Sequence, residues 1–188
     1  MLRPTFPITT RRLILRPYVE SDLDALYAIQ SREDVCKYLL FEPRTRAEVE
    51  VALQERIEVT SLEKEGDAIR PAVVLAETGE LLGDVMLMWV SEQNQCGELG
   101  FVFHPDHHGK GYAGEAATEM LRLGFEQAGL HRIIGRLDAD NRSSGRLLER
   151  LGMRFEGRFR QNEFVKGKWA DEAVYAMLAD EWRDLNEF

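Results

Sequence analysis

Apolar residues along the chain follow two spacings, one typical of strands and one typical of helices. Short apolar runs bounded by Pro, Gly or polar residues predict strands at 12–16, 71–76, 81–89 and 96–103. The segments 77–80 and 91–95 between the last three runs are short and polar, as hairpin turns are. These three strands are therefore expected to form an antiparallel meander.

Helical spacing predicts the elements between the strands. A first helix is expected behind Ser21, an N-cap candidate whose weak capping box includes Asp24, and a second over about 45–65. The clearest helical pattern starts at Ala113 and repeats at i, i+3, i+4 and i+7 up to Gly129, which is expected to end it.

The C-terminal third continues the alternation of strand and helix. We expect a strand at 132–137, a helix capped by Asn141 and ended by Gly152, a strand at 153–159, a loop at 161–167 and a strand at 169–178. The chain 1–188 is thus predicted to be one α+β domain, with about four helices and a mixed, mostly antiparallel sheet of about seven strands.

The composition and net charge of the chain indicate what class of protein it is and which partners it is expected to bind. The chain has 188 residues, 44% of them hydrophobic and 30% charged, which is typical of a soluble globular domain. No segment resembles a membrane span or a signal peptide, so we expect a cytoplasmic protein with free thiols at Cys36 and Cys96. A net charge of −9 argues against nucleic acid and mildly favours a cationic substrate such as an amine, although acidity also simply aids solubility.

Candidate chemistry centres on the glycine-rich loop 107–114, between the 96–103 strand and the clearest helix. Glycines let backbone approach a ligand closely, and the N–H groups of a first helical turn attract anions. The spacing fits neither a P-loop nor a dinucleotide fingerprint, because Gly114 falls one position short of the third glycine. The loop therefore predicts a phosphate or pyrophosphate site made of backbone, with an ordinary tight turn as the alternative.

The histidines of this region raise a second possibility, a metal site. His104, His107 and His108, together with Asp106, have the right ligand chemistry. Their spacing is not that of two ligands one helical turn apart, and Pro105 stiffens the strand exit. We therefore expect no metal.

The segment HGKGYA at 108–113 resembles the [QR]-x-x-G-x-[GA] acyl-CoA loop of the GCN5-related N-acetyltransferases (GNAT), with His108 in place of Gln or Arg. RRLILRP at 11–17 is similar to the TxRLxLRP opening strand of the RimJ/RimL-like branch. Further matching segments follow in the same order: ELGF at 98–101, HP at 104–105, GLHRI at 129–133, NRSS at 141–144 and LGM at 151–153. The resemblance covers nearly the whole chain.

The resemblance implies acetyl-CoA as cosubstrate, without a metal. The strands 96–103 and 132–137 would splay apart, and the pantetheine arm would pair with the exposed backbone between them. Asn141, besides its capping role, would contact that arm. The remaining cofactor-binding residues implied are Phe101, Val102, Phe103, His108, Gly109, Lys110, Gly111, Tyr112, Ala113 and Gly114.

Acetyl transfer needs a neutral amine, so a group must accept a proton from it. The resemblance assigns this to Glu98, whose alternative role is that of a surface salt-bridge partner. A main-chain N–H of 101–103 could polarise the carbonyl group. Ser144 is a weak general-acid candidate for the departing thiolate, and Tyr175 is weaker and more typical of a core residue.

The function implied is transfer of an acetyl group from acetyl-CoA to a primary amine, by direct attack in a ternary complex. A protein N-terminal α-amine is one acceptor. The alternatives are a small-molecule amine (an antibiotic, a polyamine or an amino acid) and a non-catalytic acyl-CoA-binding module. Segments 21–65 and 161–168, where this fold determines acceptor specificity, carry no recognisable motif. A homodimer is compatible with the sequence.

Overall fold

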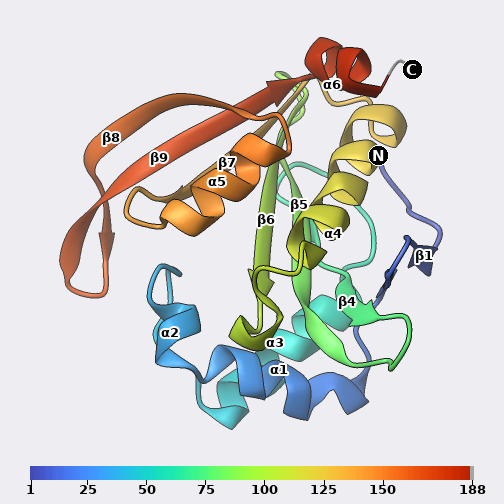
Figure 1. Ribbon diagram of the computed structural model, residues 1–188, viewed down its shortest axis with the longest axis vertical. Coiled ribbons are helices and arrows are strands. Elements are labelled where there is room, and N and C mark those ends of the chain that lie inside the picture. The colour runs from blue at the N-terminus through green and yellow to red at the C-terminus, as the bar shows by residue number, and fades with distance from the viewer. Residues whose placement is uncertain (187–188) are drawn as a thin grey trace.

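The computed structural model, which describes residues 1–186, is built on one mixed sheet of nine strands (Figure 1). In chain order these are β1 (Ile8–Thr9), β2 (Leu13–Arg16), β3 (Ala68–Ile69), β4 (Ala72–Leu75), β5 (Leu81–Ser91), β6 (Cys96–Phe103), β7 (Arg132–Asp138), β8 (Arg154–Val165) and β9 (Lys168–Leu178). Their order across the sheet is β1-β2-β4-β5-β6-β7-β9-β8, with β3 beside β5. Within residues 1–186 only β6 and β7 pair in parallel, so the predicted fold class is confirmed, with two more short strands than expected.

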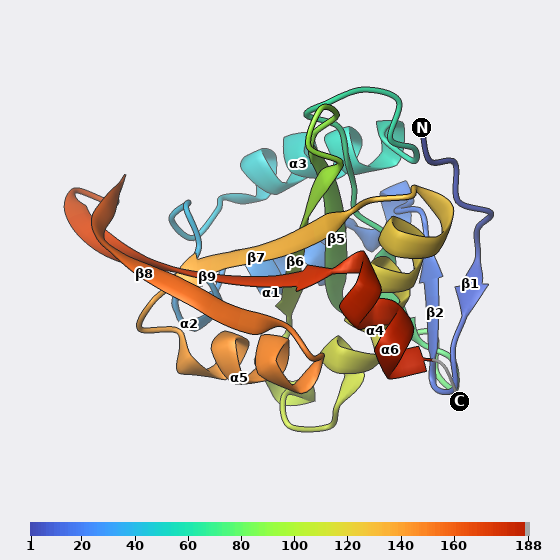
Figure 2. The ribbon, with the colours of Figure 1, turned by 90° about the horizontal axis from the view of Figure 1, so that it is seen from above.

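The described part of the chain has six α-helices, two more than predicted, and they lie on the two sides of this sheet. They are α1 (Leu23–Gln30), α2 (Glu33–Cys36), α3 (Arg46–Glu58), α4 (Tyr112–Arg122), α5 (Arg142–Arg150) and α6 (Ala179–Asn186). Figure 2 shows α3 on one side of the sheet and α4, α5 and α6 on the other. Within residues 1–186, no helix combines the length and the apolar character needed to cross a bilayer.

The helix α4 buries the apolar stripe that its sequence predicted. Ala116, Ala117, Met120 and Leu121 are each 0% exposed and belong to the core cluster that contains Leu99 of β6. The turn after Arg122 continues as a π-helical segment over Leu123–Gln127. A second core cluster, on the other side of the sheet, joins α1 and α3 to β4.

The clearest difference from the sequence-based expectation is the hairpin of β8 and β9. The loop predicted at 161–167 is mostly strand, and the turn itself is only Lys166 and Gly167. Most residues of β8 are exposed, so pairing with β9 rather than burial of an apolar face stabilises the strand, and its second half, beyond the predicted strand at 153–159, carries no alternating pattern. A register shift between Phe159 and Glu163 places Gln161 at a positive φ of 51°.

Two helix boundaries also differ from those predicted from the sequence. Ser21 is not an N-cap; it lies inside the 3-10 turn Glu20–Asp22, and α1 starts at Leu23. The helix expected over 45–65 begins as predicted, because Thr45 accepts a hydrogen bond from the N–H of Glu48, but it ends at Glu58. The β-branched residues that follow, Val59 and Thr60, have low helix propensity.

Gly83 of β5 provides a test of this packing. It pairs with Phe103 of β6, and a Cβ added to it would lie 2.2 Å from the carbonyl oxygen of Val102. We predict that Gly83→Ala lowers the free energy of unfolding by about 3 kcal/mol, because β5 and β6 must move apart. Urea denaturation, monitored by circular dichroism, measures this free energy for the variant and for the unmodified protein.

The matched control is Gly157→Ala in β8, where an added Cβ would meet only the Phe159 ring at 3.9 Å. It should change the free energy of unfolding by less than about 0.5 kcal/mol. Equal stability of the two variants would show that the β5–β6 contact is looser than described.

Candidate functional site

The strands β6 and β7 separate after a short paired stretch. They pair at three positions, the last of which is Glu98 with Ile134. Beyond this point β6 stays with β5 as far as Phe103, and β7 stays with β9 as far as Asp138, so the two strands diverge (Figure 1). The edge of β6 beyond Glu98 therefore has no strand partner on the β7 side in the described chain, as the resemblance implied. Alternate N–H and C=O groups point to such an edge and can accept an added extended chain.

The glycine loop connects the free end of β6 to α4. Gly109 and Gly111 have φ of +74° and +81°, the left-handed region that favours glycine, and Gly111 is the N-cap of α4. The first α4 N–H with a protein acceptor is that of Glu115, which bonds to the carbonyl of Gly111. The N–H groups of 109–114 have no acceptor in the part of the chain that the structure describes. The residues present thus fit a pyrophosphate, which backbone N–H groups at a helix N-terminus bind.

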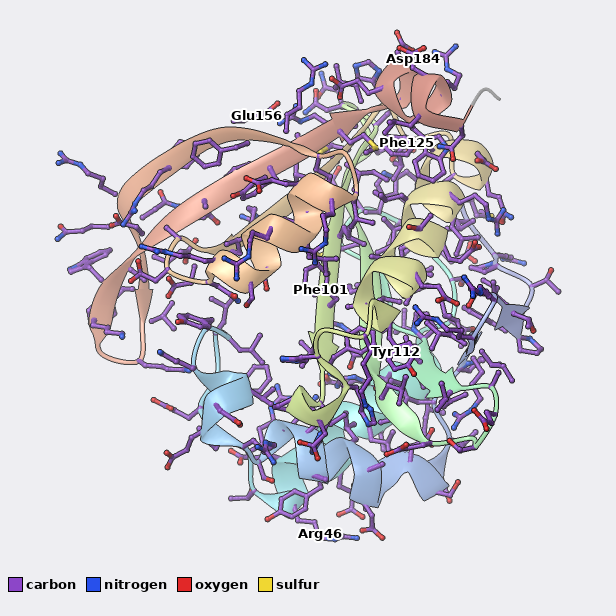
Figure 3. The ribbon with its side chains drawn as sticks, viewed as in Figure 1. Arg46, Phe101, Tyr112, Phe125, Glu156 and Asp184 are labelled. Atoms are coloured by element: carbon purple, nitrogen blue, oxygen red, sulfur yellow. The ribbon has the colours of Figure 1, made fainter. Side chains whose placement is uncertain are left out.

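Open space in front of the loop supports the same fit. A Cβ added at Gly109 would meet no atom within 4 Å. The first turn of α4 also borders α5, since a Cβ at Gly114 would lie 3.4 Å from Leu147. Figure 3 shows Phe101 on β6, between α4 and α5, and Tyr112 at the start of α4.

The histidines near the loop have protein partners. His108 Nε2 lies 3.1 Å from the carbonyl oxygen of Phe103, and because a carbonyl only accepts, this nitrogen is the donor. His107 lies 3.2 Å from Glu80, and His104 Nδ1 accepts the N–H of Asp106. Among the described residues, no group of three or more His, Cys, Asp or Glu side chains is placed to hold a metal ion. The His108 ring ties the loop to the end of β6, so the Phe103 carbonyl is already engaged.

Glu98 lies at the vertex where β6 and β7 part. It is 9% exposed, and its Oε2 accepts hydrogen bonds from Nε and Nη2 of Arg136, at 3.0 and 2.8 Å. Oε1 has no partner among residues 1–186. The sequence is compatible with two roles for Glu98, base and salt-bridge partner. The geometry includes the ion pair and leaves one carboxylate oxygen free.

A cavity of about 210 Å³ opens beside Glu98, between the β8–β9 hairpin and the segment 37–40 that follows α2. Lys166, in the turn of the hairpin, donates to the carbonyl of Cys36 at the end of α2, which holds the hairpin across the cavity. The walls combine apolar and charged side chains, among them Leu39, Leu40, Arg136, Glu163 and Glu172.

The cavity lining has five carboxylates and four basic side chains, and two of the carboxylates, Glu98 and Glu172, share the guanidinium of Arg136. Burial raises the pKa of Glu172; Arg136 opposes the rise, and the charges of Glu163 and Glu98 add to it. Arg136 lies 3.9 Å from Glu172, which also accepts a hydrogen bond from Asn162. One guanidinium thus serves both Glu98 and Glu172.

The remaining predicted site residues lie on or beside α5. Asn141 is the N-cap, as predicted, since its Oδ1 accepts the N–H of Ser144 at 3.2 Å and the hydroxyl of Ser143 at 2.9 Å. Ser144 is half-buried in the first turn. Tyr175 is a core residue, 9% exposed, with its ring edge-on to Phe155.

The structure adds three residues that the sequence did not indicate. Arg136 and Glu172 join Glu98 from the neighbouring strands, and Arg12, the residue before β2, contacts the glycine loop. The alternation of Ile134, Arg136 and Asp138 along β7 was the one available signal for Arg136, because it places all three on the same face as Glu98. Glu172 and Arg12 had no comparable local signal.

Known proteins resemble this chain in sequence over most of its length. The chain matches the acetyltransferase (GNAT) domain family over residues 12–154. It is 33% identical over 175 residues to the uncharacterized N-acetyltransferase YnaD of Bacillus subtilis, an alignment that covers 93% of this chain and 98% of that protein.

Solved structures point to the same family as the sequence comparisons. A GNAT-family acetyltransferase from Bacillus anthracis superposes with a TM-score of 0.84 at 30% identity, covering 93% of this chain and 99% of the other. A spermidine N-acetyltransferase from Vibrio cholerae, solved in complex with CoA and spermine, superposes with a TM-score of 0.77 at 23% identity, covering 92% and 99%, and so supports the fold alone. The chain therefore belongs to the GNAT family and is an acetyl-CoA-dependent N-acetyltransferase.

Proposed function

We propose that the chain transfers an acetyl group from acetyl-CoA to a primary amine, by direct attack in a ternary complex. The observation that carries the proposal is the divergence of β6 and β7 beside six N–H groups that have no acceptor in the described chain. An open strand edge suits the extended pantetheine arm, and the N–H groups suit the pyrophosphate. The two features adjoin because the glycine loop follows β6 directly.

In this proposal the cofactor is held mainly by backbone. Phe101 and the N–H of Phe103 line the open edge, whereas the backbone N–H and C=O of Val102 point to β5, as the bond from the His104 N–H to Leu82 implies. The loop from His108 to Gly114 surrounds the pyrophosphate. Lys110 adds a positive charge. Asn141 uses its side-chain oxygen as a cap, so its contact with the pantetheine arm falls to its amide nitrogen.

Glu98 is the proposed proton acceptor. Acetyl-CoA, when bound, supplies an acyl group activated as a thioester. The free Oε1 of Glu98 accepts a proton from the ammonium, directly or through a water, which leaves a neutral nucleophile, while Arg136 fixes the other oxygen. Ser144, in the first turn of α5, is the proposed donor of a proton to the departing sulfur.

The cavity beside Glu98 is the proposed acceptor site. Glu98 and Glu172 share the single guanidinium of Arg136, which favours an acceptor that arrives beside them as an ammonium ion. The resemblance of RRLILRP to the RimJ/RimL-like branch makes a protein N-terminal α-amine the first acceptor to test. The spermine in the complex of the Vibrio cholerae enzyme makes a small cationic amine the second.

A panel of acceptors, with free thiol release as the readout, separates these classes. Short peptides with a free α-amine, their N-terminally blocked forms and spermidine form the panel. We expect turnover with at least one free primary amine and none with the blocked peptides. If the protein binds acetyl-CoA but acetylates no amine, it is a non-catalytic acyl-CoA-binding module.

Gly111→Val tests the pyrophosphate site. Valine at φ +81° is strained, and its side chain would meet Arg12 Nη2, to which even a Cβ comes within 3.3 Å. We predict at least a tenfold rise in the Kd of acetyl-CoA, about 1.4 kcal/mol, measured by isothermal titration calorimetry.

Gly66→Val is its matched control. Gly66 also has a positive φ, of +94°, but lies in the loop after α3 with no atom within 4 Å of an added Cβ. Acetyl-CoA should bind this variant as it binds the unmodified protein. Equal binding by both variants would contradict the placement of the pyrophosphate at Gly111.

Glu98→Gln tests the base. The amide keeps the shape of the side chain but cannot accept the proton, so we predict a fall in kcat of about 100-fold with unchanged acetyl-CoA affinity. Glu156→Gln is the control, since Glu156 pairs with Arg132 outside the cavity. An unchanged kcat in Glu98→Gln would remove Glu98 from the mechanism while leaving the cofactor site intact.

A further inference from the structure

Arg12 precedes β2 and contacts the glycine loop and α4 with most of its polar groups. Its backbone N–H and its Nε donate to the two oxygens of Glu115, each at 2.8 Å. Its Nη1 donates to the carbonyl of Lys110 at 2.9 Å, and its guanidinium carbon lies 4.6 Å from the centre of the Tyr112 ring. Arg12 thus touches residues on both sides of Gly111.

Glu115 is the fixed partner in this arrangement. It lies in the first turn of α4, where a negative charge is favoured by the helix dipole, and its side chain is 17% exposed. Thr10 donates a hydrogen bond to it at 2.6 Å. Burial raises the pKa of Glu115, but the hydrogen bonds from Thr10 and Arg12 outweigh burial and leave the pKa below its usual value. Glu115 is therefore charged at neutral pH, and the ion pair persists.

Glycine at position 111 leaves room for this contact of Arg12 with the loop. A Cβ there would lie 3.3 Å from Nη2 of Arg12, tighter than ordinary van der Waals contact. Gly111 therefore serves two purposes, the left-handed turn and the close approach of the guanidinium. At the other end of the loop, His108 is tied to Phe103, so both ends are fixed.

From these contacts we infer that Arg12 is a positioning residue for the pyrophosphate loop. The inference rests on the proposed function. A loop with two left-handed glycines has many conformations when free, and only some of them align its N–H groups on one anion. Arg12, held by Glu115 and Thr10, removes that freedom before the cofactor binds, and such preorganisation raises affinity without adding a contact to the ligand. Arg12 itself makes no contact with the acetyl group in this account.

Arg12→Gln, assayed with two acetyl donors, tests the inference. For acetyl-CoA we expect the Kd and KM to rise about tenfold, with kcat at saturation unchanged. S-acetylpantetheine, which lacks the pyrophosphate, should be used by the variant as well as by the unmodified protein. The control is Arg3→Gln, since Arg3 forms an exposed ion pair with Glu63 away from the loop.

The outcomes separate the inference from the proposed function. If unmodified protein does not bind acetyl-CoA, the proposed function fails and the role of Arg12 fails with it. If it binds and Arg12→Gln binds equally well, only the inference is wrong. If Arg12→Gln loses activity to a similar extent with acetyl-CoA and with S-acetylpantetheine, Arg12 is merely structural and the inference is wrong.

Glu115→Gln gives a second test, with a readout that does not depend on activity. Over the described range 1–186, Arg12 and Thr10 are the side chains that hydrogen-bond to Glu115, while Glu119, one turn further along α4, pairs with Arg122. Because the folded-state pKa of Glu115 is lowered, its contribution to stability is present above the unfolded value of about 4.3 and is lost as pH falls through the folded value.

We therefore expect a lower Tm for Glu115→Gln than for the unmodified protein at pH 7, and a gap that closes as pH falls below about 4. Acetyl-CoA binding at pH 7 should weaken as in Arg12→Gln. A Tm gap that is independent of pH, or unchanged acetyl-CoA binding, would contradict the assignment.

Discussion

The strands β6 and β7 each have a second neighbour, and those neighbours hold the two strands apart beyond Glu98. Antiparallel pairing with β5 extends along β6 to Phe103, while β7 keeps its partner β9 through seven positions to Asp138. The three parallel pairs between β6 and β7 do not continue past Glu98, because β6 follows β5 and β7 follows β9 in different directions. The open edge, the position of Glu98 and the start of the glycine loop are all consequences of this divergence.

Because side chains alternate along β6, the proposed base and the helix that follows the glycine loop lie on opposite faces of the sheet. Leu99 and Phe103 pack in the cluster that includes the buried stripe of α4, and Val102 packs against the cluster of α1 and α3. Glu98 therefore faces the side on which the hairpin and the segment after α2 form the cavity. The pyrophosphate loop leads instead into α4, on the opposite side. Donor and acceptor can thus reach the gap from different sides of the sheet, as a ternary complex requires.

Local features of the site could be predicted from the sequence, and contacts between distant segments could not. The glycine loop, the α4 stripe and the Asn141 cap each depend on residues within a few positions of one another, and the structure has all three. Arg136 reaches Glu98 across 38 positions, Arg12 reaches Glu115 across 103, and Lys166 reaches Cys36 across 130. The second half of β8 was predicted as a loop for a related reason: it buries no apolar face, so only its pairing with β9 defines it as strand.

Amide hydrogen exchange with and without acetyl-CoA tests the central claim, that the open edge of β6 and the glycine loop together bind the cofactor. We predict slower exchange on binding at two places, the amides along 99–103 that face β7 and the amides of 109–114. Exchange at the outer-edge amides of β8, which lie at the end of the sheet and away from the gap, should not change. Binding that left both segments of the proposed site unprotected would contradict the claim, whatever the activity of the protein.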